Sequence, residues 1–445
     1  MQQRLFVFLT TLLINAAIFT CDVMAQRQVI DLKRWQFSRD KAEWKEVNIP
    51  HDWAIDGPFD KKWDLQTVRI EQNGEKKATE KSGRSGALPW IGKGYYKCTV
   101  QSSQFTVPDG TATLWFDGAM AEPTVYVNGQ KAGYWAYGYN AFRLDITQLI
   151  KDGDNTIEGF MEAGSHFDVP EDGVIKTELT LSKPNLWTPE TPYLYKVRTR
   201  LMRNHKVIDE TITNLGVRTV SVSREGGFQL NGVTRKIKGV CLHHDLGPLG
   251  AAVNKAALIR QIKLMKDMGC DAIRTSHNMP STMQMDLCDS LGMMVMAESF
   301  DMWIYPKCKN GYARFFKEWA EKDITNLVLN HRNHPSVIMW SIGNEIPEQW
   351  DKNAGVEWAK KLQDICHKLD PTRPVTQGMD RVDNALASGF AEVMDVVGLN
   401  YRDHKYDKAY HETTKGFILG SETASTVSSR GVYKLPYTLT DKGVY

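Results

Sequence analysis

The chain has 445 residues, of which 42% are hydrophobic and 24% are charged, and its 55 Lys and Arg face 53 Asp and Glu. A chain of this length and composition buries more than one apolar core, so disordered and fibrous proteins are excluded. The net charge of +2 and the lack of a basic stripe in the sequence argue against nucleic acid as a partner.

The first 25 residues differ in composition from the rest of the chain. Arg4 precedes an apolar run at residues 5–19, and residues 23–25 end in Ala25, which suits a cleavage site. The run is too short to span a bilayer and has no counterpart later in the sequence. We therefore expect a signal peptide at residues 1–25 and a secreted or periplasmic protein without a membrane span. Lipid attachment at Cys21 is the alternative, which the preceding residues disfavour.

The amino-terminal part of the chain has the pattern of antiparallel strands. Short β-branched or aromatic runs alternate with Gly, Asp, Asn and Pro, and Asn128-Gly129 marks a tight hairpin. The clearest runs cover residues 94–100, 111–116 and 124–127. This pattern predicts a jelly-roll-like β-sandwich at residues 26–176. A second β segment at residues 177–224 is too short for the roughly seven strands of an immunoglobulin-like sandwich, so we expect a partial one.

After residue 235 the pattern changes to alternating strands and helices. Apolar residues recur at helical spacing in residues 254–268, and a second helix is expected at residues 313–330. The seven strand-like runs cover residues 236–241, 271–275, 293–297, 337–340, 373–376, 393–399 and 417–419. Such alternation indicates a parallel sheet. The chain is thus a multidomain β plus α/β protein, with a (β/α)8-type barrel at residues 225–445 expected to lack its last strand-helix unit.

The predicted barrel strands end in polar residues. Reactive side chains in such barrels project from the carboxyl ends of the strands. The ends hold His243-His244-Asp245, residues 274–278, Glu298, Asn344-Glu345, Asn400-Tyr401 and Glu422. A single polar residue at a strand end is often structural, but six polar ends at one mouth predict an active site.

Two carboxylates at these ends suit one type of reaction. Glycoside hydrolysis needs one protonated carboxyl group to release the leaving oxygen and one ionised group to attack or to activate water. Glu345 and Glu422 end strands four and seven, which lie on opposite sides of a barrel mouth. Asn344 is placed to donate to a sugar hydroxyl, and Tyr401 is placed to hydrogen-bond Glu422.

At this point the sequence resembles glycoside hydrolase family 2, the β-galactosidase, β-glucuronidase and β-mannosidase group. Residues 333–345, Asn-His-Pro-Ser-Val-Ile-Met-Trp-Ser-Ile-Gly-Asn-Glu, are similar to its acid/base signature nearly position for position. Further similarities are the second signature at residues 272–280 and 288–292, the first-strand motif at residues 239–243, and the sugar-binding-like amino-terminal sandwich at residues 50–53 and 57–59. Asp271 stands where the second signature usually has Asn.

The resemblance implies an exo-acting β-glycosidase, of the β-galactosidase type, that retains configuration by double displacement. It implies that Glu345 is the acid/base and Glu422 the nucleophile. The residues implied to line the sugar subsite are His243, Arg274, His277, Asn344 and Tyr401. The expected partner is an oligosaccharide or another β-glycoside substrate.

Two departures from the family pattern affect the expected metal binding and the expected sugar specificity. Asp301, Met302 and Trp303 stand where related galactosidases hold magnesium with Glu and His, so we expect no metal ligand and no cofactor. Glu298 is expected to hydrogen-bond residues around the site. Ser425 replaces a His of some galactosidases, which weakens galactose specificity and leaves β-glucuronidase and β-mannosidase as alternatives.

Compared with the family pattern, the chain looks shortened at two places. Residues 162–184 pass almost directly into the last strands of the immunoglobulin-like segment, and residues 423–445 are too few for a further strand and helix. A catalytically weak or inactive carbohydrate-binding remnant of such an enzyme is therefore the alternative function. The sequence leaves the oligomeric state open.

Overall fold

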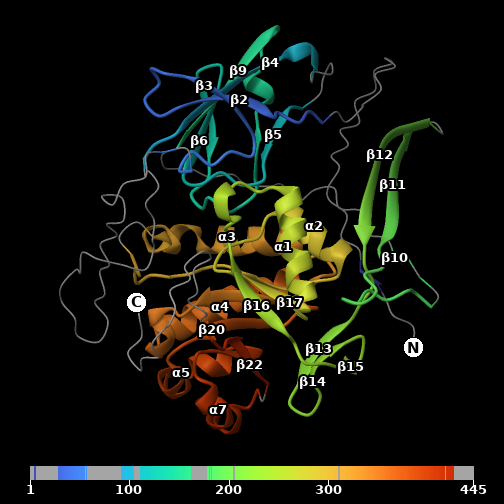
Figure 1. Cartoon of the computed structure of the whole chain (residues 1–445), viewed down its shortest axis with the longest axis vertical. Helices are drawn as coiled ribbons and strands as arrows, with labels where there is room; N and C mark the ends of the chain where they lie inside the picture. Colours follow the sequence, from blue (N-terminus) through green and yellow to red (C-terminus); the bar gives the residue numbers. More distant parts are fainter. Residues whose placement is uncertain are drawn as a thin grey trace, which may run out of the picture.

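The computed structural model describes residues 5–6, 29–55, 57, 92–104, 111–161, 178–179, 181, 183–203, 206–308, 311–415 and 417–424. Within these ranges, no helix combines the length and apolar character needed to cross a bilayer. The predicted signal peptide lies outside them except for Leu5–Phe6, and so does Ser425. Figure 1 shows the amino-terminal sandwich at one end of the molecule, next to a β/α unit, with a long hairpin at one side.

The amino-terminal domain is an antiparallel sandwich, as predicted. One sheet has the order β3-β2-β4-β9-β6-β7, and a second layer pairs β5 with β8. The strands are β2 (Arg34–Ser38), β3 (Lys45–Asn48), β4 (Tyr95–Gln101), β5 (Thr113–Phe116), β6 (Pro123–Val127), β7 (Gln130–Tyr134), β8 (Phe142–Asp145) and β9 (Asp154–Met161). Asn128 and Gly129, with φ of 51° and 78°, turn the β6–β7 hairpin that the sequence predicts.

The middle segment forms small antiparallel sheets rather than a complete sandwich. Its strands are β10 (Glu178–Leu179), paired with β1 (Leu5–Phe6), then β11 (Tyr195–Arg203), β12 (Lys206–Leu215), β13 (Val220–Ser223), β14 (Gly227–Leu230) and β15 (Val233–Thr234). The hairpin of β11 and β12 is the long one at the side in Figure 1. Trp187 is fully buried in a cluster with Phe228 and Met294, which ties this segment to the β/α unit. The predicted boundary between residues 224 and 225 falls in the turn between β13 and β14.

The carboxyl-terminal part contains seven parallel strands in sequence order, which confirms the predicted strand count for the described residues. They are β16 (Gly239–His243), β17 (Ala272–Ser276), β18 (Met294–Glu298), β19 (Val337–Asn344), β20 (Val375–Met379), β21 (Val396–Asn400) and β22 (Ile418–Glu422). The sheet curls so far that Cys241 Sγ of β16 lies 3.3 Å from the Ser421 carbonyl of β22. Residues 425–445, where the shortened end is predicted, lie outside the described ranges.

Helices follow the strands and enclose the curled sheet. They are α1 (Lys255–Asp267), α2 (Thr282–Leu291), α3 (Phe316–His331), α4 (Ala354–Leu369), α5 (Val382–Ser388), α6 (Phe390–Val393) and α7 (Tyr406–Glu412). Asn254 caps α1 by accepting from Ala257 N, and Ser281 caps α2 by accepting from Gln284 N. The α3 helix starts three residues later than predicted, because a short 3-10 turn at Tyr312–Arg314 precedes it.

The sandwich is joined to the β/α unit by a buried carboxylate. Asp323 of α3 has no exposed surface. Its Oδ1 accepts from Asn140 Nδ2 at 2.6 Å and from Trp135 Nε1 at 3.2 Å, and the Tyr312 hydroxyl donates to its Oδ2. Burial raises the pKa of Asp323 to about 7. The loop after β7 is therefore held tightly against α3, and it brings the sandwich close to the barrel mouth.

Candidate active site

The two carboxylates of the predicted site lie at the ends of β19 and β22, which are separated in the sheet by β20 and β21. Glu345 follows β19 directly, and Glu422 is the last residue of β22. Asn400, at the end of β21, donates to Glu345 Oε1 at 3.1 Å. Its Oδ1 accepts from the Ser421 hydroxyl at 2.7 Å, next to Glu422. Asn400 thus links the strand ends that carry the two carboxylates.

Glu422 is held by a cation and a hydroxyl group. Arg274 Nη1 donates to its Oε1 at 2.7 Å, and the Tyr401 hydroxyl donates to its Oε2. His277 Nε2 lies 3.5 Å from the same Oε1. The Tyr401 contact is the one expected from the sequence. A guanidinium group and a hydroxyl donor stabilise a negative charge and fix the carboxylate's orientation.

Arg274 is the buried centre of the site. Its Nε donates to Glu298 Oε2 at 2.7 Å and its Nη2 donates to Asn344 Oδ1 at 3.0 Å, while 3% of the side chain is exposed. Burial alone would lower the pKa of this guanidinium, but Glu298 and Glu422 beside it raise the pKa overall. A charged Arg274 therefore connects β17 with three other strand ends.

Glu298 orients the groups that surround Glu422. It is fully buried and accepts from Arg274, from the Ser341 hydroxyl at 2.5 Å, and from His277 Nδ1 at 2.6 Å when that nitrogen is protonated. Although burial opposes ionisation, the neighbouring Arg274 and His277 keep the pKa of Glu298 below its ordinary value. Glu298 has the hydrogen-bonding place that the sequence predicts for it.

Glu345 lies in a different electrostatic environment. Burial raises its pKa, the hydrogen bond from Asn400 opposes this, and the negative charge of Asp380 adds to it. Its backbone has a φ of 42° and is fixed by a hydrogen bond from Glu345 N to the Gly378 carbonyl at 2.8 Å. A left-handed conformation is uncommon for a glutamate and is often found at functional positions. Burial around Glu345 thus contrasts with the guanidinium and hydroxyl donors around Glu422.

Gly378 of β20 provides the space in which these groups meet. A Cβ at this position would lie 2.7 Å from Arg274 Nη2 and 2.8 Å from Asn400 Oδ1. We expect Gly378→Ala to lower the free energy of unfolding by about 1–3 kcal/mol, because buried polar groups would have to move apart. Denaturant unfolding checks this, and an unchanged midpoint would show that the network adjusts without cost.

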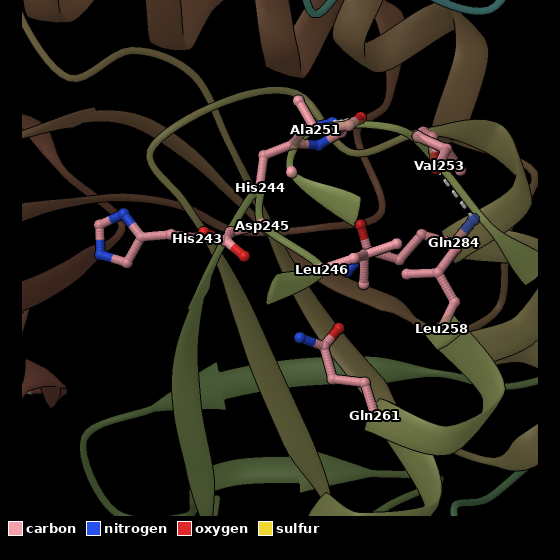
Figure 2. A pocket seen from close by; sticks show the side chains of 11 residues that line it. His243, His244, Asp245, Leu246, Ala251, Val253, Leu258, Gln261 and Gln284 are labelled. Atoms are coloured by element: carbon pink, nitrogen blue, oxygen red, sulfur yellow. Dashed lines mark hydrogen bonds between the residues drawn. The ribbon is translucent and has the colours of Figure 1, made fainter. Parts of the chain in front are cut away.

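His243 completes the group of predicted residues. Its ring packs edge-on against His277 with centroids 5.1 Å apart, and burial lowers its pKa. Figure 2 shows its imidazole pointing away from a small recess, whose lining includes Leu246, Leu258 and Gln261. The recess shares His243 with the site, but neither Glu345 nor Glu422 lines it.

All seven predicted site residues therefore lie in one connected group, although their roles remain predictions. Asn344 is held by protein groups on both sides of its amide: its Nδ2 donates to Asp301 Oδ1 at 3.0 Å, and its Oδ1 accepts from Arg274 and Asn400. One hydrogen of Nδ2 is left for the predicted sugar hydroxyl. Lys307, which binds Asp301 and the Asn344 carbonyl, had no signal in the sequence. Asn400 did have a signal in the sequence, since it ends a predicted barrel strand.

One group of possible metal ligands lies elsewhere in the described part of the chain. Asp286, Asp289 and His334 bring ligand atoms within 4.8 Å of one another. Asp289 already accepts from Ser336 N, and its other oxygen lies 2.6 Å from His334 Nδ1. The contacts of Asp289 therefore join α2 to the segment just before β19, which is a structural role. The absence of a metal ligand at the site itself remains a prediction.

A curled parallel β/α sheet with two carboxyl groups in different surroundings at its carboxyl-terminal mouth is the arrangement of a barrel glycoside hydrolase. The sequence profile described as "Glycosyl hydrolases family 2, TIM barrel domain" matches residues 220–444, and the profile "Glycosyl hydrolases family 2" matches residues 139–218. The chain belongs to glycoside hydrolase family 2.

Known relatives agree with this family. The beta-galactosidase BoGH2A of Bacteroides ovatus is 30% identical over 513 positions, which cover 88% of this chain and 58% of the relative. A beta-glucuronidase of Bacteroides fragilis is 31% identical over 53% of this chain and 33% of its own length. A solved family 2 member from Bacteroides cellulosilyticus superposes with a TM-score of 0.70 at 30% identity, covering 85% of this chain and 59% of that one.

The chain spans about half the length of the curated relatives that it matches. The alignment with BoGH2A runs over 513 positions, more than the 445 residues of this chain, so that relative contains residues without a counterpart here. This agrees with the internal shortening that the sequence suggests.

Proposed function

We propose that this protein is an exported, retaining exo-β-glycosidase of the β-galactosidase type. The observation that carries the proposal is the contrast between the two carboxyl groups. Burial raises the pKa of Glu345, whereas Arg274 and Tyr401 hold Glu422 by hydrogen bonds. Two carboxyl groups in such different surroundings suit one acid and one nucleophile.

In the first step of the proposed reaction, Glu422 attacks the anomeric carbon and forms a glycosyl ester. The bond to the aglycone breaks as Glu345 transfers its proton to the leaving oxygen. In the second step Glu345, now ionised, takes a proton from water while the water oxygen attacks the anomeric carbon. Glu422 leaves as a carboxylate and Glu345 is protonated again, so the sugar is released with its original configuration.

The choice of galactose rests on the name of BoGH2A, which matches most of this chain. A β-glucuronidase is the second candidate, because the Bacteroides fragilis relative carries that name. A β-mannosidase stays open from the resemblance to the family as a whole. Export rests on the apolar run at residues 5–19, and detection of the chain in the periplasmic fraction, with Gln26 as its first residue, would support it.

Hydrolysis by the purified chain tests the proposal directly. We would measure turnover of nitrophenyl β-galactoside, β-glucuronide and β-mannoside, and record the first sugar anomer released by proton NMR. A Glu345→Gln, Glu422→Gln double variant, prepared identically, controls for contaminating glycosidases. We expect the β-galactoside to be hydrolysed fastest, with the β anomer formed first. A folded chain that binds a sugar but hydrolyses none of the three would support the carbohydrate-binding remnant instead.

The charges around Glu345 predict how activity depends on pH. A general acid must be protonated, so kcat/KM falls as the pH rises through the pKa of Glu345. The carboxylate of Asp380 raises this pKa and the ammonium group of Lys307 lowers it. We therefore expect Asp380→Asn to move the alkaline limb of the profile to lower pH, and Lys307→Met to move it to higher pH. Shifts in the same direction for both variants would contradict the assignment of Glu345 as the acid.

A further inference from the structure

The sandwich contacts the β/α unit at the two strand-end segments that carry the site's histidines. One is the loop at residues 244–251, which continues directly from His243 at the end of β16. The other begins at the end of β17 and contains His277 and Asn278. Loops depend on neighbouring groups for a fixed conformation, so the groups that hold these two segments influence the position of both histidines.

Asp52 of the sandwich holds the first loop. Its Oδ2 accepts from Ala251 N at 2.8 Å, and its Oδ1 accepts from Ala54 N at 2.9 Å, so both oxygens have partners. Gly250, with a φ of 56°, permits this approach, because a Cβ there would lie 2.3 Å from Asp52 Oδ2. The turn at Asp52 and the barrel loop therefore fit together without room for a side chain between them.

The same loop is fixed a second time at His244. The ring of Tyr139, from the sandwich, packs edge-on against His244 with centroids 5.2 Å apart. His244 Nε2 lies 3.1 Å from the Ala251 carbonyl, so this imidazole joins the loop's two ends when Nε2 carries the proton. Figure 2 shows the side chains of His243 and His244 leaving the strand end in different directions. Holding His244 in place thus fixes the backbone next to the point from which the side chain of His243 leaves the strand.

Tyr137 of the sandwich holds the second segment. Its hydroxyl donates to Asn278 Oδ1 at 2.8 Å, and its ring packs against Tyr312 and Phe300 with centroids 4.8 Å and 5.9 Å away. Asn278 directly follows His277, whose two ring nitrogens face Glu298 and Glu422. The hydroxyl of Tyr137 therefore holds Asn278, and the residue before it, His277, lies next to Glu422.

We propose that Asp52 and Tyr137 are positioning residues through which the sandwich sets the place of His243 and His277 in the sugar subsite. This inference rests on the proposed glycosidase function. Among the described residues, neither Asp52 nor Tyr137 hydrogen-bonds Glu345 or Glu422. The sandwich therefore acts on the binding of the sugar, while the two carboxylates keep their own partners.

The test compares Asp52→Asn and Tyr137→Phe with wild type in the full chain. Both changes are nearly isosteric: asparagine keeps one of the two acceptor oxygens, and phenylalanine keeps the ring packing. We expect KM for the nitrophenyl glycoside that the wild type hydrolyses best to rise about tenfold in each variant, because small displacements at a site have large effects. We expect kcat to stay within about twofold of wild type and the thermal midpoint to match that of the control.

Glu122→Gln is the matched control. Glu122 of the sandwich pairs with Arg314 of the β/α unit at a partly exposed position, so its loss weakens the same domain contact without touching either loop. Isothermal titration calorimetry with an imino sugar that has no carboxyl group gives a second readout, which does not require turnover. We expect the Kd of this compound to rise in the two variants and not in the control.

Three results would overturn the inference. Unchanged KM and Kd in both variants would contradict the positioning role and leave the proposed function intact. An equal rise of KM in the control would show a general effect of domain contact. A folded wild type that neither hydrolyses nor binds would overturn the proposed function, and the positioning role with it.

Discussion

Replacing Glu422 by glutamine is expected to lower kcat for an aryl β-glycoside by about three orders of magnitude or more, because the amide cannot form the glycosyl ester. Arg274 and Tyr401 would still surround the side chain, so the fold should be kept. Steady-state kinetics and circular dichroism on the same preparation check both statements.

Two further variants make this result specific. Glu357→Gln removes an exposed carboxylate of α4 that is not among the site residues, and it should leave kcat unchanged. Glu422→Ala leaves a cavity beside Arg274, and we expect added azide to restore turnover and to yield an α-glycosyl azide. Near wild-type turnover in Glu422→Gln would exclude Glu422 as the nucleophile, and rescue that yields the β-azide would contradict the two-step mechanism.

Glu298→Gln is expected to have the second-largest effect. It should lower both the stability of the protein and its turnover. The substitution removes the charge that faces buried Arg274 and places an amide among donors from Arg274, His277 and Ser341. Breaking a buried ion pair by removing one partner costs about 3–5 kcal/mol, so we expect a loss of this order in the free energy of unfolding. Denaturant unfolding measures the stability, and kcat/KM should fall as Arg274 loses its orientation.

An exposed ion pair offers the matched comparison for Glu298. Glu210 of β12 pairs with Arg200 of β11 on the hairpin surface. Surface pairs contribute little, so Glu210→Gln should leave the unfolding midpoint nearly unchanged. Equal, small effects of the two substitutions would show that the site does not depend on Glu298.

The strand ends of the site could be predicted because the chemistry of a parallel barrel is concentrated there. Glu298 and Glu422 follow apolar runs, and the structure places each as the last residue of its strand. The predicted strands ended too early, since the apolar runs stop before the backbone pairing does. His243, for example, still pairs with Ser276 although both are polar, because ladder hydrogen bonds do not depend on the side chain.

Long-range contacts could not be predicted in the same way. The position of Asn344 depends on Asp301, 43 residues away, and the loop after His243 depends on Asp52, 199 residues before Ala251. A single sequence has no local signal for such pairs. The β12 strand has only a weak signal of its own within the predicted β segment, because Lys206–Leu215 alternates polar residues with a few β-branched ones on an exposed hairpin.

The central claim is that this chain forms a covalent intermediate on Glu422. Intact-mass spectrometry after incubation with an aryl 2-deoxy-2-fluoro-β-galactoside tests it most directly, since the fluorine slows hydrolysis of the glycosyl ester more than its formation. We predict a mass increase of one fluoro sugar, located by peptide mapping at Glu422 and absent in Glu422→Gln. A folded, sugar-binding chain that gains no mass from the galactoside or the matching glucuronide, or that gains it at another residue, would contradict the assignment.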